Sequence, residues 1–282
     1  METFLEILKA IFIGIVQGIT EWLPVSSTGH MILVNEFIRL DVSDAFFELF
    51  EVVIQFGSIL AVIILFFDKL NPFSRKKDDE MKKKTWTLWL KVIVAVLPAA
   101  IIGLPLDDWF QAHFYNYIVV AIALVVYGIL FIVIERHNKN KPKKYEDVYD
   151  IDYPTALKIG GFQVLSIIPG TSRSGSTILG ASLVGVSRTA AAEFSFFMAI
   201  PVMLGASAYK ALKYMVKVGT ALTSTEIIVL IVGTFTAFLV SVAVIKFLMD
   251  FVRKHSFESF GWYRIALGTV VIGYFLLKNF VF

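Results

Sequence analysis

At Thr20–His30 the chain reads Thr-Glu-Trp-Leu-Pro-Val-Ser-Ser-Thr-Gly-His, a polar stretch inside an apolar segment that extends from Leu5 to Phe37. A second apolar segment, Thr155–Val186, is interrupted in the same way by Pro-Gly-Thr-Ser-Arg-Ser-Gly-Ser-Thr at Pro169–Thr177. Each half of either segment is about 12 residues long, whereas a helix needs roughly 20 apolar residues to cross a bilayer core. We therefore predict two re-entrant hairpins, in which a pair of short helices enters the membrane and returns to the same side.

The rest of the chain is dominated by longer apolar stretches. Hydrophobic residues make up 57% of its 282 residues and charged residues only 17%, whereas soluble domains carry about 25% charged residues. Too little charge remains to cover a water-facing surface, so lipid must cover much of the protein. The sequence thus predicts an all-α integral membrane protein with six transmembrane helices and two re-entrant hairpins. The six predicted spans lie at approximately Phe46–Phe67, Trp86–Leu104, Tyr117–Ile134, Ala190–Ala211, Glu226–Leu248 and Trp262–Leu277.

The composition also excludes several classes of function. The chain has no cysteine, so disulfides, thiolate metal sites and cysteine nucleophiles are ruled out. The net charge of +3 gives no support for nucleic acid as a partner. The first residues lack the basic region of a signal peptide, so we expect the first apolar segment to remain in the mature protein.

Lysine and arginine are distributed unequally between the loops. Seven lie in Asp68–Lys84, six in Arg136–Lys158 and three in Asp250–Arg264, which fall on one side of a six-span protein. An excess of positive charge marks cytoplasmic loops. We therefore expect these three segments on the cytoplasmic side of the membrane and both termini on the outside.

The two halves of the sequence align when the second is shifted back by 146 residues, which places Gln17 on Gln163 and Ser26 on Ser172. With three spans in each half, the second copy is inverted in the membrane. Inverted repeats with broken helices place their polar site near the midplane. The predicted organisation is a first repeat at 1–137 (hairpin at about 5–37), a cytoplasmic linker at 138–152, and an inverted second repeat at 153–282 (hairpin at about 155–186).

The first hairpin carries polar residues at spacings that suit a binding site. Gln17 and Glu21 are four residues apart and share one face of the first helix. Pro24 ends that helix, and Ser26 or Ser27 can cap the helix that follows. In the second hairpin Thr171 or Ser172 can act as the cap, and Arg173 lies in the break.

This arrangement favours an anionic ligand. A helix N-terminus attracts phosphate through its exposed N–H groups and partial positive charge, and arginine can bind phosphate through two hydrogen bonds at once. Two helix N-termini and one guanidinium together suit a diphosphate.

Two plainer interpretations of these residues must be weighed. Glu21 and Arg173 could serve only to neutralise each other and hold the hairpins together, and His30 could be an ordinary buried histidine. Ionisable residues at membrane depth cost several kcal/mol and usually mark functional sites. A packing pair also leaves the surrounding hydroxyls and glycines unexplained, and His30 follows Ser27 by three residues in the polar break. These observations favour a functional site.

The stretches Gln17–His30 and Pro169–Thr177 resemble the two signatures of the bacterial undecaprenyl-pyrophosphate phosphatase family, which is associated with bacitracin resistance. Phe50–Leu60 and Val186–Phe196 resemble the family too, and the similarity extends from near Ala10 to the C-terminus. The resemblance implies a hydrolase of the bacterial plasma membrane that converts undecaprenyl diphosphate to undecaprenyl phosphate and inorganic phosphate, recycling the lipid carrier of cell-wall synthesis. It further implies a site open to the outer face and a divalent cation, Mg²⁺ or Ca²⁺.

The resemblance also implies roles for individual residues. Ser27 and His30 match the proposed nucleophile and its acid/base partner, and Glu21 matches a metal ligand or base. Gln17 matches a position where relatives have Glu or Gln, and its carboxamide weakens any scheme with two carboxylates on the metal. The candidate phosphate-binding residues are Arg173, Ser26, Thr28, Ser172, Ser174 and Thr177, and the candidates for supporting contacts are Gln55, Glu51 and Glu193.

Several alternatives stay open from the sequence. The nucleophile could be Ser27, His30 or water, and the same scaffold could instead flip a lipid carrier or transport an anion. The acid phosphatase-like lipid phosphatases are disfavoured, because Leu179 occupies the position six residues after Arg173 where they carry a histidine. Faces rich in Ala and Gly, such as Gly180–Ser182 and Gly205–Ser207, allow a homodimer or close packing within one chain.

Overall fold

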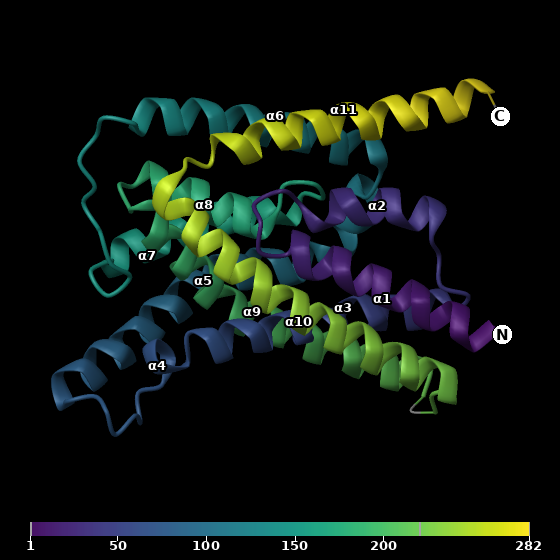
Figure 1. Cartoon of the computed structure of the whole chain (residues 1–282), viewed down its shortest axis with the longest axis horizontal. Helices are drawn as coiled ribbons and strands as arrows, with labels where there is room; N and C mark the ends of the chain where they lie inside the picture. Colours follow the sequence, from purple (N-terminus) through teal and green to yellow (C-terminus); the bar gives the residue numbers. More distant parts are fainter. Residues whose placement is uncertain (1, 220, 282) are drawn as a thin grey trace.

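The computed structural model describes the backbone of every residue except Met1, Thr220 and Phe282 and the side chains of all others except residues 2, 104, 107, 108, 111 and 279–281, and the described part of the chain is built from helices (Figure 1). This arrangement confirms the prediction of an all-α membrane protein. In chain order the elements are α1 (Glu2–Thr20), α2 (Ser27–Phe37), α3 (Asp44–Leu65), α4 (Phe67–Leu70), α5 (Asp79–Phe114), α6 (Tyr117–Asn138), α7 (Tyr153–Val164), the 3-10 turn η1 (Leu165–Ile167), α8 (Arg173–Leu183), α9 (Arg188–Lys217), α10 (Ser224–Lys254) and α11 (Glu258–Val281).

Seven of the described helices are long and apolar enough to cross a membrane, namely α1, α3, α5, α6, α9, α10 and α11. Six of them correspond to the predicted spans, although α3 ends at Leu65, two residues before the predicted end at Phe67. The seventh, α1, has 19 residues, so the predicted length of about 12 residues for the first arm of the first hairpin is wrong. The apolar sequence before Gln17 continues to the N-terminus without a helix-breaking residue, and the helix follows it.

The two hairpins enter the molecule from opposite ends (Figure 1). Helices α1 and α2 form an antiparallel pair that opens toward the end where both termini lie, and α7 and α8 open toward the other end. The turns that connect the two helices of each hairpin, residues 21–27 and 168–173, are called the tips, and they meet in the interior. Whether α1 and α2 together form a re-entrant hairpin in a bilayer stays a prediction.

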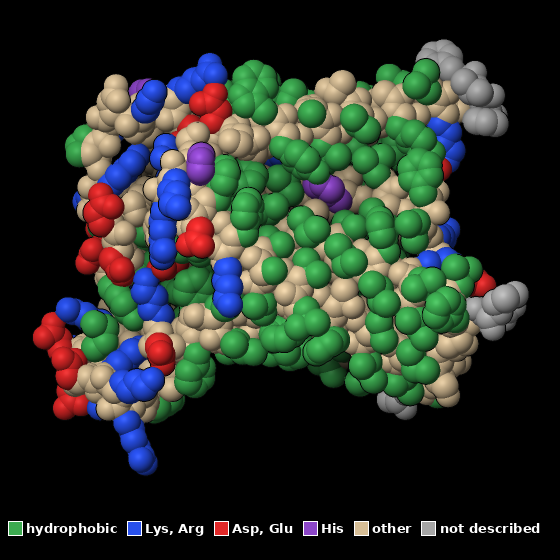
Figure 2. Space-filling model, in the orientation of Figure 1, with side chains coloured by type: hydrophobic (Ala, Val, Ile, Leu, Met, Phe, Trp, Pro, Cys, Tyr) green, Lys and Arg blue, Asp and Glu red, His purple; other side chains and the backbone are tan. Residues whose placement is uncertain are grey.

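Charged side chains gather at one end of the molecule, on the left in Figure 2, while hydrophobic side chains cover the middle of this face. The charged end carries the α6–α7 connection, which packs against the second hairpin. There Asp152 caps α7, accepting hydrogen bonds from the Thr155 N–H at 2.8 Å and the Tyr145 hydroxyl at 2.7 Å. Hydrogen bonds from Thr155 and Tyr145 lower the pKa of Asp152 to about 2. The connection is therefore a docked segment.

Equivalent helices pack in equivalent ways in the two halves. Helix α1 packs on α10 and α7 packs on α5, so the first arm of each hairpin lies against a helix of the other half. At both helix–helix contacts the backbones approach so closely that only glycine fits. A Cβ at Gly14 would lie 2.7 Å from the Gly233 carbonyl oxygen, and a Cβ at Gly160 would lie 2.0 Å from the Ala95 carbonyl oxygen. Gly14 and Gly160 are 146 residues apart, like the polar motifs. The division of the chain at 138–152 stays a prediction with which these pairings agree.

Candidate active site

Two serines shape the hairpin tips. Ser26 caps α2 and accepts a hydrogen bond from the Gly29 N–H at 3.3 Å, and Ser172 caps α8 in the same way with Gly175 at 3.1 Å. Both serines have φ of 73°, a conformation that is unfavourable for a side chain with a Cβ. The structure thus selects Ser26 and Ser172 from the alternatives that the sequence left open for the caps. The same strained turn at both tips presents the first N–H groups of both helices toward the interior.

An ion pair joins the two tips. Arg173 donates from Nη2 to Glu21 Oε1 at 3.2 Å and from Nη1 to the Ser195 carbonyl at 3.0 Å. The other oxygen of Glu21 accepts from Gln17 Nε2 at 2.9 Å. Gln17 and Glu21 are 3% and 8% exposed. Residues 152 positions apart in the sequence therefore share one buried polar cluster.

The hydroxyls of the second motif hold the tips in place. Ser174 donates to the backbone carbonyls of Glu21 at 3.3 Å and Leu23 at 3.4 Å. Thr177 lies 2.6 Å from the Ser195 hydroxyl. Both side chains are thus engaged with protein atoms in this structure.

A second arginine, Arg264 of α11, was missed as a site residue. Its side chain is fully buried and donates from Nη1 to the Pro24 carbonyl at 3.2 Å and from Nη2 to the carbonyls of Gly170 at 2.8 Å and Thr171 at 3.0 Å. Counting Arg264 among the cytoplasmic loop charges was wrong. The signal was present, because Arg264 lies inside the predicted span that begins at Trp262, and an arginine within a span is rarely neutral to function.

His30 of α2 is held between two partners. Its Nδ1 lies 2.7 Å from the Ser26 carbonyl oxygen and its Nε2 lies 2.7 Å from the Tyr263 hydroxyl. The His30 and Tyr263 rings are stacked at 5.7 Å. Ser27, the first residue of α2, is half-buried, and its hydroxyl makes no hydrogen bond to a described residue, His30 included. Sequence reasoning also missed Tyr263, whose partner is 233 residues away.

Other predicted residues lie farther from the tips or make no polar contact there. Thr28 is half-buried in the first turn of α2. Glu193 pairs with Lys69 at 2.5 Å, at the charged end of the molecule. Within the described part of the chain, Gln55, Glu51 and Glu193 form no hydrogen bond or ion pair with the tips. Their supporting role stays a prediction.

The oxygen atoms at the tips that could bind a metal ion are too few to hold it without further ligands. The described residues include no group of three or more His, Asp or Glu side chains placed to hold a metal ion. Glu21 and Gln17 offer one carboxylate and one carboxamide. Mg²⁺ is commonly held by one or two carboxylates together with substrate phosphates and water. The residues therefore fit a cation shared with a bound diphosphate, and they do not form a cage of protein ligands alone.

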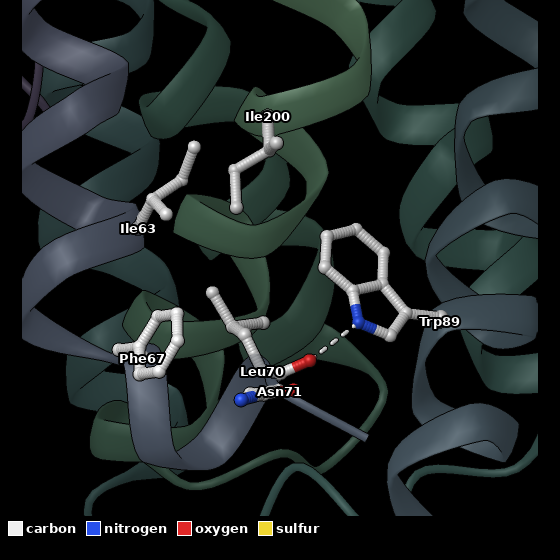
Figure 3. Close-up of a pocket in the computed structure, with 6 residues that line it drawn as sticks. All are labelled: Ile63, Phe67, Leu70, Asn71, Trp89 and Ile200. Atoms are coloured by element: carbon white, nitrogen blue, oxygen red, sulfur yellow. Dashed lines mark hydrogen bonds between the residues drawn. The ribbon is translucent and has the colours of Figure 1, made fainter. Parts of the chain in front are cut away.

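An apolar pocket has walls from α3, α4, α5 and α9 and no residue of either tip in its lining (Figure 3). It has a volume of about 220 Å³ and is lined by Ile63, Phe67, Leu70, Asn71, Trp89 and Ile200. The indole N–H of Trp89 donates to the Leu70 carbonyl at 2.8 Å within its wall. Because its lining contains no charged side chain, this pocket is no candidate for binding a diphosphate.

Known proteins resemble the chain over nearly its whole length. The family model described as bacitracin resistance protein BacA matches residues 10–270. An undecaprenyl-diphosphatase of Enterococcus faecalis is 59% identical over 98% of this chain and 99% of its own length. Undecaprenyl-diphosphatase 1 of Clostridioides difficile is 59% identical over 98% and 100% of the two chains, and an undecaprenyl-diphosphatase of Limosilactobacillus fermentum is 55% identical over 97% and 99%. The chain therefore belongs to the BacA family of bacitracin resistance proteins.

Proposed function

We propose that this protein hydrolyses undecaprenyl diphosphate to undecaprenyl phosphate and inorganic phosphate, and so recycles the lipid carrier of cell-wall synthesis. The observation that carries the proposal is the contact between the hairpin tips, where Arg173 meets Glu21 at 3.2 Å beside the N-termini of α2 and α8. Helix N-termini and arginine are both suited to phosphate. The names of the relatives agree with this chemistry.

In the proposed reaction the Ser27 hydroxyl oxygen attacks the terminal phosphorus. The bond between that phosphorus and the bridging oxygen breaks, and undecaprenyl phosphate leaves. The Ser27 proton passes to His30 or to Glu21, and water then hydrolyses the phosphoserine to release inorganic phosphate. In one competing scheme His30 is the nucleophile, and in the other a water molecule attacks the phosphorus directly.

In this scheme hydrogen-bond donors that are in place before the reaction stabilise the negative charge of the phosphates. Such preorganised donors are usually the largest single contribution to catalysis. Arg173 has a spare donor, because its buried Nε has no hydrogen-bond partner among the described residues. Ser26, Thr28 and Ser172 contribute through the backbone N–H groups of the tips. Ser174 acts mainly by holding the two tips together, and Thr177 by joining α8 to Ser195 of α9.

A divalent cation, Mg²⁺ or Ca²⁺, is proposed as cofactor, with Glu21 and Gln17 as its protein ligands. When bound it would neutralise part of the diphosphate charge. Chelation is therefore expected to lower the rate of phosphate release, and re-addition of Mg²⁺ or Ca²⁺ to restore it.

The proposed setting is the bacterial plasma membrane, with both termini and the opening of the site on the outer face. The termini lie at the end of the molecule opposite to the charge-rich end (Figures 1 and 2), which agrees with positive loops in the cytoplasm. A homodimer is also proposed, through the small residues near Gly205, where a Cβ would meet no described atom within 4 Å.

The test is phosphate release from undecaprenyl diphosphate by the purified protein in detergent, where transport is impossible. We expect release, and a fall of at least about 100-fold in Ser27→Ala. Ser224→Ala is the matched control, because Ser224 is likewise the first residue of a helix and is exposed. Absence of release together with lipid or anion movement in liposomes would support the transporter alternative.

The nucleophile is assigned by trapping radiolabelled phosphate on the protein. Label on Ser27 supports the scheme proposed here. Label on His30, or absence of label with normal turnover, would support one of the competing schemes.

A further inference from the structure

The contact between His30 and Tyr263 connects the first polar motif with the last helix of the chain. Tyr263 lies in α11, and its hydroxyl is 2.7 Å from His30 Nε2. The two rings are almost parallel, at an interplanar angle of 8°. The histidine is therefore held both by a hydrogen bond and by a ring face.

The partners of His30 fix its tautomer. A backbone carbonyl can only accept a hydrogen bond, so the short contact of Nδ1 with the Ser26 carbonyl at 2.7 Å places the proton on Nδ1. In a neutral imidazole Nε2 then carries the lone pair, and the Tyr263 hydroxyl is its donor. The bond that Nδ1 makes thus sets which nitrogen is free to act as a base.

Tyr263 is held in place through its neighbour in the sequence. Arg264 binds the Pro24 carbonyl of one tip and the Gly170 carbonyl of the other, and it is fully buried. Helix α11 is thereby fixed against both tips at the turn that carries Tyr263. Tyr263 as a whole is 48% exposed, so the contact with His30 is not enclosed in the core.

We propose that Tyr263 is a positioning residue for the hydrolysis and acts through His30. This inference rests on the function proposed above. The phenol keeps the His30 ring in the tautomer whose Nε2 is unprotonated and holds it against the tip. In the reacting complex the phenol turns away from the Nε2 lone pair, which the Ser27 hydroxyl then occupies, and the phenol oxygen accepts a hydrogen bond from the Nε2–H group as that group forms. As the bond from Ser27 oxygen to phosphorus forms, the Ser27 proton moves to Nε2, and Tyr263 keeps its own proton throughout.

The first test is Tyr263→Phe, which removes the hydrogen bond and keeps the stacked ring. We expect kcat to fall by about 10-fold, less than the roughly 10²–10⁴-fold that general acid–base catalysis itself supplies, because Tyr263 only positions the base, and KM to change by less than about twofold. Tyr274→Phe is the matched control: it removes a phenol from the same helix, where Tyr274 contacts Phe37 and Phe275, and full activity is expected. A kcat equal to that of the unaltered protein would overturn the proposal.

The second test is a double-mutant cycle with His30→Gln. If Tyr263 acts only through His30, Tyr263→Phe lowers kcat by less than about twofold in the His30→Gln background. If the two losses multiply, Tyr263 acts elsewhere and the proposal is wrong.

A third measurement separates this inference from the proposed function. In ¹⁵N NMR of the histidine-labelled protein, with the His30 signal assigned by its loss in His30→Gln, we expect the tautomer with the proton on Nδ1. The signal of the Nε2 nitrogen should move in Tyr263→Phe and stay in place in Tyr274→Phe. If the unaltered protein releases no phosphate, the proposed function fails whatever the NMR shows. If it does release phosphate and the His30 signal ignores Tyr263→Phe, only the inference about Tyr263 fails.

Discussion

Two arginines occupy the centre of the molecule and serve different purposes. Arg173 meets a carboxylate, Glu21, and so can exchange partners when an anion binds. Arg264 donates its hydrogen bonds to backbone carbonyls that belong to both tips, and its guanidinium lies over the Tyr127 ring at 5.6 Å. The first arrangement suits a binding site, and the second suits a permanent brace between the hairpins.

The brace can be tested with Arg264→Lys. Lysine offers a single amino group, which cannot reach the carbonyls of both tips as the two Nη atoms do. At least one carbonyl is left without a donor, which costs about 1–3 kcal/mol. We expect a lower thermal unfolding midpoint in detergent together with slower phosphate release. Arg136→Lys is the control, since Arg136 pairs with Glu258 on the surface; equal loss in the two variants would contradict the brace.

The sequence revealed the site residues whose signal is local, and missed those whose signal depends on folding. Glu21, His30 and Arg173 stand out because each is ionisable within an apolar segment. From its sequence context Tyr263 is one of the tyrosines expected at the membrane–water interface. Its proposed role depends on His30, which lies 233 positions away in the sequence. Glu193 shows the converse: its position near the start of a span is visible in the sequence, but its pairing with Lys69 is not, and its supporting role stays a prediction.

At the level of elements, each hairpin depends on one strained turn. Ser26 and Ser172 combine φ of 73° with a capping hydrogen bond. The hydrogen bond of the side chain stabilises the turn, and the positive φ of the backbone destabilises it. Glycine adopts such a conformation without a Cβ penalty, and as an N-cap it costs only a few tenths of a kcal/mol relative to serine. Alanine loses the hydrogen bond and keeps the Cβ.

At an ordinary N-cap glycine costs a few tenths of a kcal/mol and alanine about 1 kcal/mol, and relief of the positive φ adds to the advantage of glycine at Ser172. We expect Ser172→Ala to lower the free energy of unfolding by about 1 kcal/mol, Ser172→Gly to leave it unchanged or raise it, and Ser187→Gly to lower it by a few tenths. Thermal unfolding of the two variants in the same detergent measures the difference. Ser187 caps α9 with φ of −63°, so Ser187→Gly lacks the relief of strain and is the control. A glycine variant less stable than the alanine variant at Ser172 would refute the argument.

Element boundaries were predictable where the breaking residues are strong and uncertain elsewhere. Pro24 and the Pro169–Gly170 pair lie in the turns at which the first arms of both hairpins end. No such residue limits α1 at its start, so its 19 residues exceed the predicted length. Its extension packs along α10, a tertiary contact that the local sequence does not reveal.

For the whole molecule, the inverted arrangement of the two halves and the distribution of charged side chains indicate the same orientation in the membrane. The α6–α7 connection lies at the charge-rich end, while the end of α9 lies with the termini at the opposite end (Figure 1). If the positive end is cytoplasmic, these two segments lie on opposite sides of the membrane. Helix α1 is long enough to cross a membrane, but the structure places the Thr3 hydroxyl 3.3 Å from that of Thr225 at the start of α10, so the start of α1 lies at the same end as the end of α9.

Single cysteines can decide the orientation, because the protein has none of its own. Asn140 in the α6–α7 connection and Lys217 at the end of α9 are both exposed. We expect Lys217→Cys to react with a membrane-impermeant maleimide in intact spheroplasts and Asn140→Cys to react only in inverted vesicles. A cysteine placed at Thr3 should behave like the one at position 217 if α1 and α2 return to the same side, and like the one at position 140 if α1 crosses alone. The cysteine-free protein reports background labelling in each preparation. Labelling of positions 140 and 217 from the same side would refute the topology, because the six spans after the first hairpin would then have to be rearranged.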